Sequence, residues 1–444
     1  MKITFANHAS FIVEHEGVTL ISDPWLFGPA FNDGWDLIAE TVLSPEQLAS
    51  VDYIWVSHEH PDHFSPRVLL SIPREQRAKI TVLYQHTNDG KVLNFCAKQG
   101  FRTRELGLGE RVRLGPGFEV ECRRVPLYDA WLLIETPEAR VLNLNDAVVH
   151  TERDLRALAR EVGPIDLLCT QFSYAGWRGN AADSHMRRND AARKLDILRT
   201  QVRTLEPRYT MPFASFCWFS HEENDFINDS VNTPADALAA VRESGSTPVL
   251  FYPGDTWEVG SSHDNGPALE RWTADYGSLG TRARRSAETV PFETLAKTAE
   301  AYAERIRAKN DPRVLWLLRR NPVLPALRPI EIHLWDLDMD VRFSFEKGLE
   351  RISGRSADYD LRMGSASLQF LMKQPWGIDT LTVNGRFYAD PGGLKRLVTT
   401  FGVDLLNNAG IILDPAFLVD FPSIGFLLGV LLRKLRSMRA AAVT

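Results

Sequence analysis

The sequence predicts a layered α/β domain over about the first 260 residues, followed by a smaller α+β unit. Three observations support this prediction: short β-type runs open the chain, helical apolar patterns alternate with them, and the composition changes after Asp255. The 444 residues are enough for two or three domains of ordinary size.

Short apolar runs of the strand type recur through the first part of the chain, and Gly17 marks a turn between two of them. The predicted strands cover residues 3–5, 10–13, 18–22, 52–57, 79–84, 118–125, 130–135 and 140–145. Helical apolar spacing occurs between and after them, at residues 44–50, 67–71, 154–162 and 191–205. We therefore expect residues 1–260 to form one α/β domain.

The second part of the chain has a different composition. Residues 256–290 are rich in Ser, Gly, Asp and Arg, which predicts a loop or lid, and residues 293–309 look helical. Three prolines, at positions 322, 325 and 329, then form a hinge-like stretch. Residues 261–327 are therefore expected to be a loop or helical linker.

Residues 328–444 are expected to form the accessory α+β domain. Strand-like alternation covers residues 330–345 and 358–362, and residues 365–373 are helical in pattern. Asn384-Gly385 is a strong two-residue hairpin signal, so residues 380–383 and 386–389 are predicted to be its strands. In residues 422–439 an apolar run precedes several basic residues. This segment predicts either a terminal helix that caps a core or a dimer, which we prefer, or a helix that meets acidic lipid.

Composition and charge narrow the class of protein. Hydrophobic residues make up 44% and charged residues 24%, as in ordinary globular proteins, and the net charge of −6 excludes a general nucleic-acid footprint. Four singly spaced cysteines predict a reducing compartment. No signal-peptide core and no apolar run of about 18 residues is present. We therefore expect a cytoplasmic protein that acts on a small molecule, with a homo-oligomer left open.

The strongest chemical signal is the segment Ser57-His58-Glu59-His60-Pro61-Asp62-His63, which directly follows a predicted strand. Neutral imidazole nitrogen and carboxylate oxygen are good ligands for zinc or iron. On a strand-to-helix turn, His58 and His60 can point to one ion, while Asp62 and His63 face a second. The segment therefore predicts a dinuclear metal site; a surface loop that happens to be rich in histidine is the alternative.

This H-x-H-x-D-H pattern resembles the signature of the metallo-β-lactamase superfamily, whose fold is a four-layer αβ/βα sandwich. The segments His8–Phe11 and Ser22–Trp25 are similar to the opening of the lactonase and phospholipase branch. A closer resemblance is to the catalytic part of CMP-N-acetylneuraminate hydroxylase. It is carried by Asp23–Leu26, Gly28–Phe31, Gly34-Trp35, Ser57–Phe64, Val141–Asn143 with Asp146, and Pro212–Ser215 with His221, and more weakly by 379–391.

The resemblance implies the remaining ligands. Hydrolases of the superfamily usually place a further histidine where this chain has Asp129, so Asp129 is the best candidate for that position. Asp146 would bridge the two ions, and His221 would be the last ligand of the second site. The implied set is His58, His60 and Asp129 on one ion and Asp62, His63 and His221 on the other, with Asp146 between them.

The donor set bears on the metal. Three carboxylates favour iron or manganese over the zinc of an all-histidine site, although zinc also accepts Asp and His. A di-iron centre would activate O2, as the hydroxylase resemblance implies. The hydroxylase also has a Rieske iron–sulfur domain with Cys-x-His motifs, which none of the four cysteines here forms. An oxygenase of this kind would need an external reductase or ferredoxin.

Five more residues are candidates for catalysis or substrate binding. His8 is expected near the metal face, where it could orient a ligand or substrate, and Tyr128 could donate a hydrogen bond to bound oxygen or substrate. Trp25, Trp177 and Arg178 are candidates for the substrate pocket, Arg178 for a phosphate or carboxylate. For each of them a packing or surface role is the alternative.

The preferred function is a di-iron monooxygenase that hydroxylates a polar metabolite. The second hypothesis is a zinc or manganese hydrolase of the lactonase or phosphodiesterase type, in which the ions generate hydroxide from water. A third is a metal-binding scaffold that recruits a partner.

Overall fold

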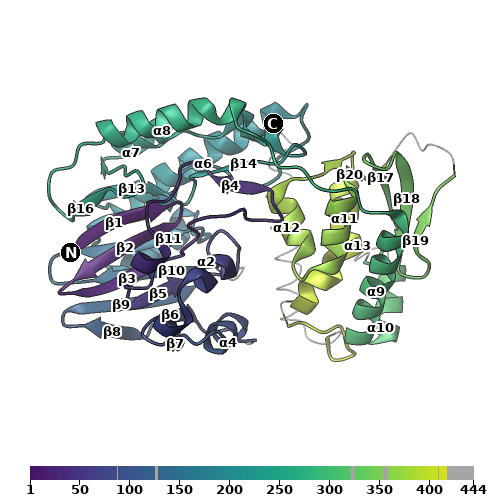
Figure 1. Cartoon of the computed structure of the whole chain (residues 1–444), viewed down its shortest axis with the longest axis horizontal. Coiled ribbons are helices and arrows are strands. Elements are labelled where there is room, and N and C mark those ends of the chain that lie inside the picture. Colours follow the sequence, from purple (N-terminus) through teal and green to yellow (C-terminus); the bar gives the residue numbers. More distant parts are fainter. Residues whose placement is uncertain (88, 126–128, 322–325, 354–358, 409, 418–444) are drawn as a thin grey trace.

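The first 260 residues form a sandwich of two seven-stranded sheets in the computed structural model (Figure 1), which describes residues 1–87, 89–125, 129–321, 326–353, 359–408 and 410–417. The first sheet has the order β16-β1-β2-β3-β5-β6-β7. Its strands are Thr256–Glu258, Lys2–Asn7, Ser10–His15, Val18–Ser22, Tyr53–Val56, Thr81–Gln85 and Arg102–Leu106. Strands β3, β5, β6 and β7 run parallel, and the others are antiparallel.

The second sheet mirrors the first, with the order β15-β13-β12-β11-β10-β9-β8. Its strands are Thr247–Pro248, Tyr209–Phe213, Leu167–Gln171, Arg140–Asn145, Ala130–Glu135, Phe118–Arg124 and Arg111–Gly115. The large core between the sheets contains Phe5, Trp55, Phe118, Leu132 and Phe213, all fully buried. Burial of these alternate side chains on facing strands is the main stabilising term of the sandwich.

Helices cover both outer faces of the sandwich (Figure 1). On the first sheet lie α1 (Pro45–Leu48), α2 (Pro66–Ser71), α3 (Arg74–Arg77) and α4 (Lys91–Lys98), with their own apolar cluster. On the second lie α5 (Glu152–Val162), α6 (Ser184–Leu205) and α7 (Pro234–Glu243). The predicted four-layer αβ/βα sandwich is therefore confirmed.

A small sheet of β4 (Trp35–Leu37) and β14 (Cys217–Phe219) flanks the sandwich, near the 3-10 helix η1 (Asp225–Ser230). The expected loop at 256–290 is wrong in part, because it contains α8 (Gly266–Ser278) and the short helix η2 (Leu279–Thr281). Trp272 explains the difference: this fully buried side chain stacks on Phe216 with ring centroids 4.2 Å apart, so packing overrides the polar composition.

The C-terminal unit is a five-stranded sheet with helices against it, of order β19-β18-β17-β20-β21. Its strands are Gly348–Arg351, Met339–Ser344, Ile330–Leu334, Leu361–Met363 and Tyr388–Ala389. The helices are α9 (Phe292–Lys309), α10 (Pro312–Arg320), α11 (Ser365–Lys373), α12 (Gly377–Asn384) and α13 (Gly393–Asn408). In Figure 1, α12 lies on the side of this unit that faces the sandwich.

The hairpin predicted around Asn384-Gly385 is wrong. Residues 380–383 belong to α12, and only Tyr388–Ala389 of the expected second strand pairs with the sheet. Gly385 has a φ of +67° and donates its N–H to the carbonyl of Leu381, so Asn-Gly ends a helix here instead of turning a hairpin. The same left-handed glycine serves both structures, which is why the local signal is ambiguous.

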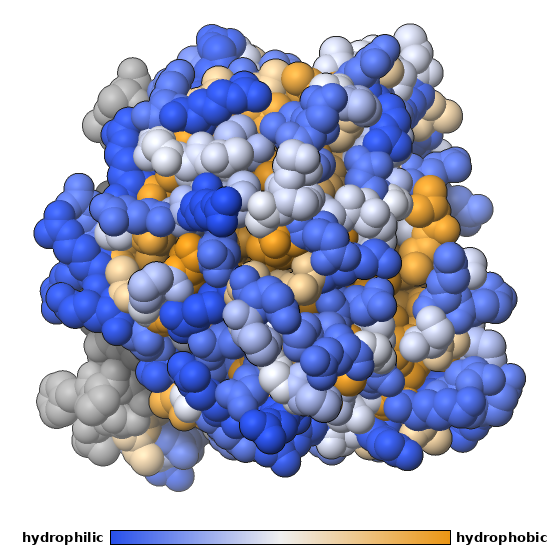
Figure 2. Space-filling view, turned by 90° about the vertical axis from the view of Figure 1, so that its left-hand side faces the viewer, coloured by the Kyte–Doolittle hydropathy of each residue, from blue (hydrophilic) through white to orange (hydrophobic). Residues whose placement is uncertain are grey.

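The surface at the end of the sandwich and the length of the helices bear on contact with membranes. Figure 2 shows hydrophilic residues over most of the face at the end of the sandwich, with hydrophobic residues between them. In the described ranges, no helix has both the length and the apolar character needed to cross a bilayer. The segment 422–439, predicted to be a terminal helix, lies outside the described residues, as do Pro322 and Pro325.

Candidate metal centre

The histidine-rich segment forms a turn between β5 and α2. The backbone N–H groups of His63 and Phe64 both donate to the carbonyl of His60, at 3.0 and 2.7 Å, and Pro66 starts α2 after the N-cap Ser65. His58, Asp62 and His63 are buried, with 2%, 3% and 0% of their surface exposed. A tight turn at the carboxyl end of a parallel strand thus holds His58, Asp62 and His63 inside the protein.

One group of donor atoms forms around His58. Its Nε2 lies 2.9 Å from Nδ1 of His60 and 3.6 Å from Oδ1 of Asp129. Asp129 comes from the connection between β9 and β10, in the second sheet. His60 and Asp129 thus each lie next to His58, and their sharing of a first ion stays a prediction.

A second group forms around His63. Its Nε2 lies 3.4 Å from Oδ2 of Asp62 and 3.4 Å from Oδ1 of Asp146, which directly follows β11. His8, in the turn between β1 and β2, places its Nε2 3.3 Å from Oδ2 of Asp62. Ligand atoms of His8, Asp62 and His63, and likewise those of His58, His63 and Asp146, all lie within 4.8 Å of one another. His63 connects the two sets, so the geometry suits two neighbouring ions.

The chemistry of the donor atoms fits a cation. Nε2 of His8, Oδ1 of Asp62 and Nε2 of His63 are buried and have no hydrogen-bond partner in the described part of the chain. Buried polar atoms rarely stay unsatisfied unless something binds them. Burial and the charge of Asp146 raise the pKa of Asp129 to about 8, because carboxylates are crowded together in this cluster.

Hydrogen bonds on the outer side of each ring hold the histidines in the tautomer that can bind a metal. Asp23 is fully buried and accepts from the backbone N–H of Ser57 at 2.7 Å, from its hydroxyl at 2.8 Å, and from Nδ1 of His63 at 2.9 Å. Because the Ser57 hydroxyl donates to Asp23, it accepts from Nδ1 of His58, 2.9 Å away. Nε2 of both rings is then free to act as a ligand.

His60 is held from the C-terminal unit. Its Nε2 lies 2.9 Å from Oδ2 of Asp379 in α12, while its Nδ1 faces His58. Burial lowers the pKa of His60, but the hydrogen bond and charge of Asp379 outweigh that effect and raise it to about 9. A cation at Nδ1 would displace a proton from this ring. By contrast, burial and the neighbouring His63 and His60 lower the pKa of His58 well below its usual value.

Of the two remaining residues with expected roles at the metals, His221 lies in the described part of the chain and Tyr128 does not. His221 is buried, with Nδ1 3.2 Å from the backbone nitrogen of Glu223; of the described residues, the carboxylates of the cluster form no ion pair with it. Its role as a ligand stays a prediction.

The candidates for the substrate pocket are mostly buried. Trp25 is 1% exposed and packs edge-on against His8, with ring centroids 5.3 Å apart. Trp177 stacks on Phe387 at 5.2 Å. Arg178 donates its Nε–H to Asp190 at 2.5 Å. These positions leave their roles in substrate binding as predictions.

Sequence reasoning missed several residues next to the ligands. Asp23 lies in a segment that carries the family resemblance, but no function was predicted for it. Asp379 follows His60 by 319 positions, and no local pattern indicated that the two residues meet. Gln171 donates its Nε2–H to Asp146 and accepts from Nζ of Lys194 at 2.9 Å. For Gln171 and Lys194, the available sequence signal was the alternation of β12 and the apolar spacing of α6, which together place both residues at this edge of the sheet.

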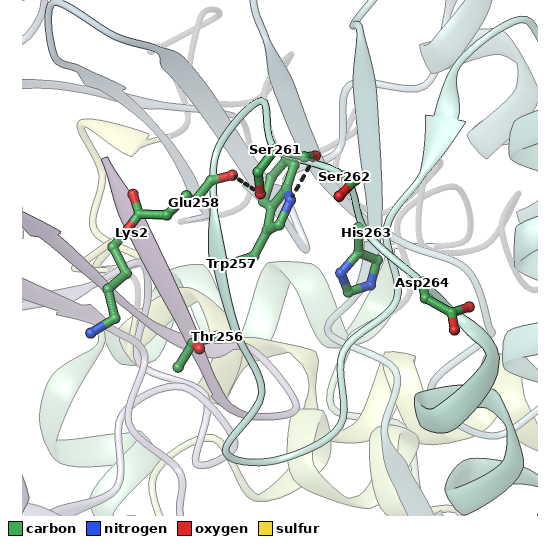
Figure 3. A pocket seen from close by; sticks show the side chains of 8 residues that line it. All are labelled: Lys2, Thr256, Trp257, Glu258, Ser261, Ser262, His263 and Asp264. Carbon is green, nitrogen blue, oxygen red and sulfur yellow. Dashed lines mark hydrogen bonds between the residues drawn. The ribbon is translucent and has the colours of Figure 1, made fainter.

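A cavity of about 240 Å³ lies elsewhere, at the edge of the first sheet. It is lined by Lys2, Thr256, Trp257, Glu258, Ser261, Ser262, His263 and Asp264 (Figure 3). The Trp257 indole donates to the carbonyl of Ser261, which stabilises the turn after β16. This cavity includes none of the predicted site residues.

Comparison with known proteins shows what the chain is similar to. Residues 2–128 match the model of the Beta-lactamase superfamily domain. A Mycolicibacterium smegmatis protein named as a Rieske 2Fe-2S iron–sulfur protein is 26% identical over 442 residues, covering 90% of this chain and 84% of that protein. The cytidine monophosphate-N-acetylneuraminic acid hydroxylase of Danio rerio is 23% identical over 272 residues, covering 57% of this chain and 45% of that protein.

Hydrolases also occur among the relatives. A metal-dependent hydrolase of Carboxydothermus hydrogenoformans is 28% identical over 234 residues, covering 49% of this chain and 86% of that protein. Among solved structures, the diiron β-hydroxylase CmlA of Streptomyces venezuelae has 21% identity and a TM-score of 0.43, covering 58% of this chain and 54% of that one. Of the Danio rerio hydroxylase described above, the chain spans less than half of the length.

Proposed function

We propose that this chain, whose first part matches the Beta-lactamase superfamily domain, is a dinuclear metal oxygenase that hydroxylates a polar metabolite. The observation that carries the proposal is the convergence of three carboxylates, Asp62, Asp129 and Asp146, on the histidine turn. Oxygen-rich ligation with imidazole suits iron better than it suits a zinc hydrolase. The likeness to the Danio rerio hydroxylase over 272 residues supports the same conclusion.

The proposed ligands form two sets. One ion would be held by His58, His60 and Asp129, and the other by Asp62, His63 and His8, with Asp146 as a further ligand of the centre. His8 enters this set because its Nε2 lies 3.3 Å from Asp62 and has no hydrogen-bond partner in the described residues. His221 remains an alternative for the second ion.

Two iron ions bound in these sets would supply the reduction of O2 and the oxidising chemistry. The chain itself holds the ligands in the required tautomers through Ser57, Asp23 and Asp379, and buries His58 and His63 from water. Electrons would come from a ferredoxin, a reductase or a Rieske centre. Similarity to the M. smegmatis protein named for such a centre supports this part of the proposal.

The proposed substrate carries an anionic group. Lys194 reaches Gln171, which donates to Asp146, and no carboxylate of the described residues lies within 4.0 Å of Nζ of Lys194. Burial lowers the pKa of Lys194, although Asp190 and Asp146 oppose this effect. Together with Arg178, this lysine would bind a phosphate or carboxylate at the edge of the centre, and Trp177 and Trp25 would form walls.

A zinc or manganese hydrolase is the second candidate, favoured by the likeness to the C. hydrogenoformans hydrolase. The same residues would then hold ions that lower the pKa of bound water and polarise the scissile group. His63 and Asp146 would keep their roles as ligands in such a hydrolase.

The deciding experiment measures metal content and O2 use of aerobically purified protein. The oxygenase predicts two irons per chain and O2 consumption when the protein is chemically reduced. Two zincs, turnover of a phosphodiester such as bis(p-nitrophenyl) phosphate and no O2 consumption would refute it. Asp129→His sharpens the test, because this change should abolish O2 consumption while a hydrolase could retain activity.

A further inference from the structure

The C-terminal unit reaches into the metal centre through one side chain. Asp379 lies in the first turn of α12, and its Oδ2 is 2.9 Å from Nε2 of His60. The side chains of Asp379 and His60 are 23% and 37% exposed, so both are partly shielded from solvent. This contact joins two segments separated by 319 positions in the sequence.

The contact determines which nitrogen of His60 faces the cluster. A carboxylate only accepts hydrogen bonds, so Nε2 of His60 carries the proton that it donates to Asp379. Nδ1, on the other side of the ring, lies 2.9 Å from Nε2 of His58. In the neutral ring, the lone pair of Nδ1 therefore faces Nε2 of His58 in the cluster.

Buried polar contacts hold α12 in register with the sandwich. Asn384, at the end of α12, donates its side-chain N–H to the carbonyl of Phe31 at 3.0 Å, and Asn224 donates to the carbonyl of Asn384 at 2.7 Å. The backbone N–H of Trp177 donates to the carbonyl of Thr382 at 2.9 Å.

The loop after α12 is equally constrained. Arg386, 2% exposed at its side chain, pairs with Glu223 at 2.6 Å. A Cβ on Gly385 would lie only 2.4 Å from Ile227, so this close approach requires glycine. Asp379 is thus presented to His60 from a helix that can shift little relative to the sandwich.

We propose that Asp379 is a positioning residue that holds His60 in the Nε2–H tautomer, and that the C-terminal unit is thereby an integral part of the metal centre. This inference rests on the proposed metal-binding function. Loss of such an outer hydrogen bond typically lowers metal affinity by about 10–100-fold.

The test uses the full chain and four variants. Asp379→Ala and Asp379→Leu remove the acceptor, and Leu keeps a side chain of similar length. Asp379→Asn keeps a neutral acceptor in its side-chain oxygen. Asp390→Asn is the matched control, because Asp390 pairs with Arg362 at 2.5 Å in the same unit and, among the described residues, forms no ion pair with the centre. Each chelator-treated protein is titrated with Co²⁺ against a competing chelator, and its absorption spectrum and unfolding temperature are recorded.

The expected result is a loss of about 10–100-fold in Co²⁺ affinity for one ion in the Ala and Leu variants, with an altered cobalt spectrum. The Asn variant should recover most of the affinity, and the Asp390 control should behave like the unchanged protein. Unchanged affinity and spectrum in folded Ala and Leu variants would overturn the inference, as would a lower unfolding temperature alone. If the unchanged protein binds no pair of ions, the proposed metal centre itself fails.

Discussion

Asp23→Asn should weaken both metal binding and folding stability, although it only replaces one carboxylate oxygen by an NH₂ group. Oδ1 of Asp23 accepts the backbone N–H of Ser57, while Oδ2 accepts both the Ser57 hydroxyl and Nδ1–H of His63. An asparagine must place its NH₂ group against one of these donors, because it has only one acceptor oxygen. In either orientation, a buried donor faces a donor.

The magnitude follows from the burial of the site. Asp23 is 0% exposed, so one mismatched hydrogen bond should reduce the free energy of unfolding by about 1–3 kcal/mol. Where the NH₂ group faces His63, Nδ1 must become the acceptor and Nε2 carries the proton. This places a proton on the atom 3.4 Å from Asp62 and Asp146, so we expect metal affinity to fall about 10–100-fold.

The assay combines urea unfolding of the metal-free protein with Co²⁺ titration. Asp52→Asn is a close control, since Oδ2 of Asp52 also accepts a backbone N–H and a hydroxyl, both from Thr19, but at the solvent-exposed surface and without a histidine. The reasoning is refuted if Asp23→Asn binds Co²⁺ as tightly as the unchanged protein, or loses no more stability than the Asp52 variant.

Three further predictions concern the interface, the pH dependence and the metal. Glu223→Gln leaves the buried guanidinium of Arg386 unpaired, so urea unfolding should show a loss of about 3–5 kcal/mol, and the double variant with Arg386→Met should lose less. Burial, Lys194 and Arg193 lower the pKa of His150 from 6.5 to about 3. Below pH 6.5 the unfolded chain therefore takes up a proton that the native state does not. Between pH 7 and pH 5, the free energy of unfolding of the unchanged protein should fall by about 1 kcal/mol more than that of His150→Gln, a value reduced for the solvent around this partly buried ring. If the two proteins lose stability equally over this range, the lowered pKa of His150 is contradicted. Removing metal with a chelator should lower the free energy of unfolding by about 2.7 kcal/mol relative to protein with free metal 100-fold above its Kd, and unchanged calorimetric unfolding would argue against a bound ion.

Local sequence was sufficient for much of the fold. Strands such as β10 and β11 and the helices α9 and α11 appear where apolar spacing predicted them, because burial on one face imposes a period that the sequence must show. The prediction of a hairpin at Asn384-Gly385 was wrong because it rested on a local turn signal alone. A left-handed glycine ends a helix as readily as it turns a hairpin, and only packing against Ile227 and Trp177 distinguishes the two structures.

The sequence by itself also indicated the kind of chemistry, since three histidines and an aspartate in six residues are typical of metal binding. The resemblance added Asp129, Asp146 and His8 as expected neighbours, but only the tertiary structure decided which contacts the distant residues make. It brought His8 to Asp62 and Asp379 to His60, contacts that no spacing predicts. The physical reason is that a ligand's tautomer depends on partners supplied by whichever segment packs there, and that packing is a property of the whole chain.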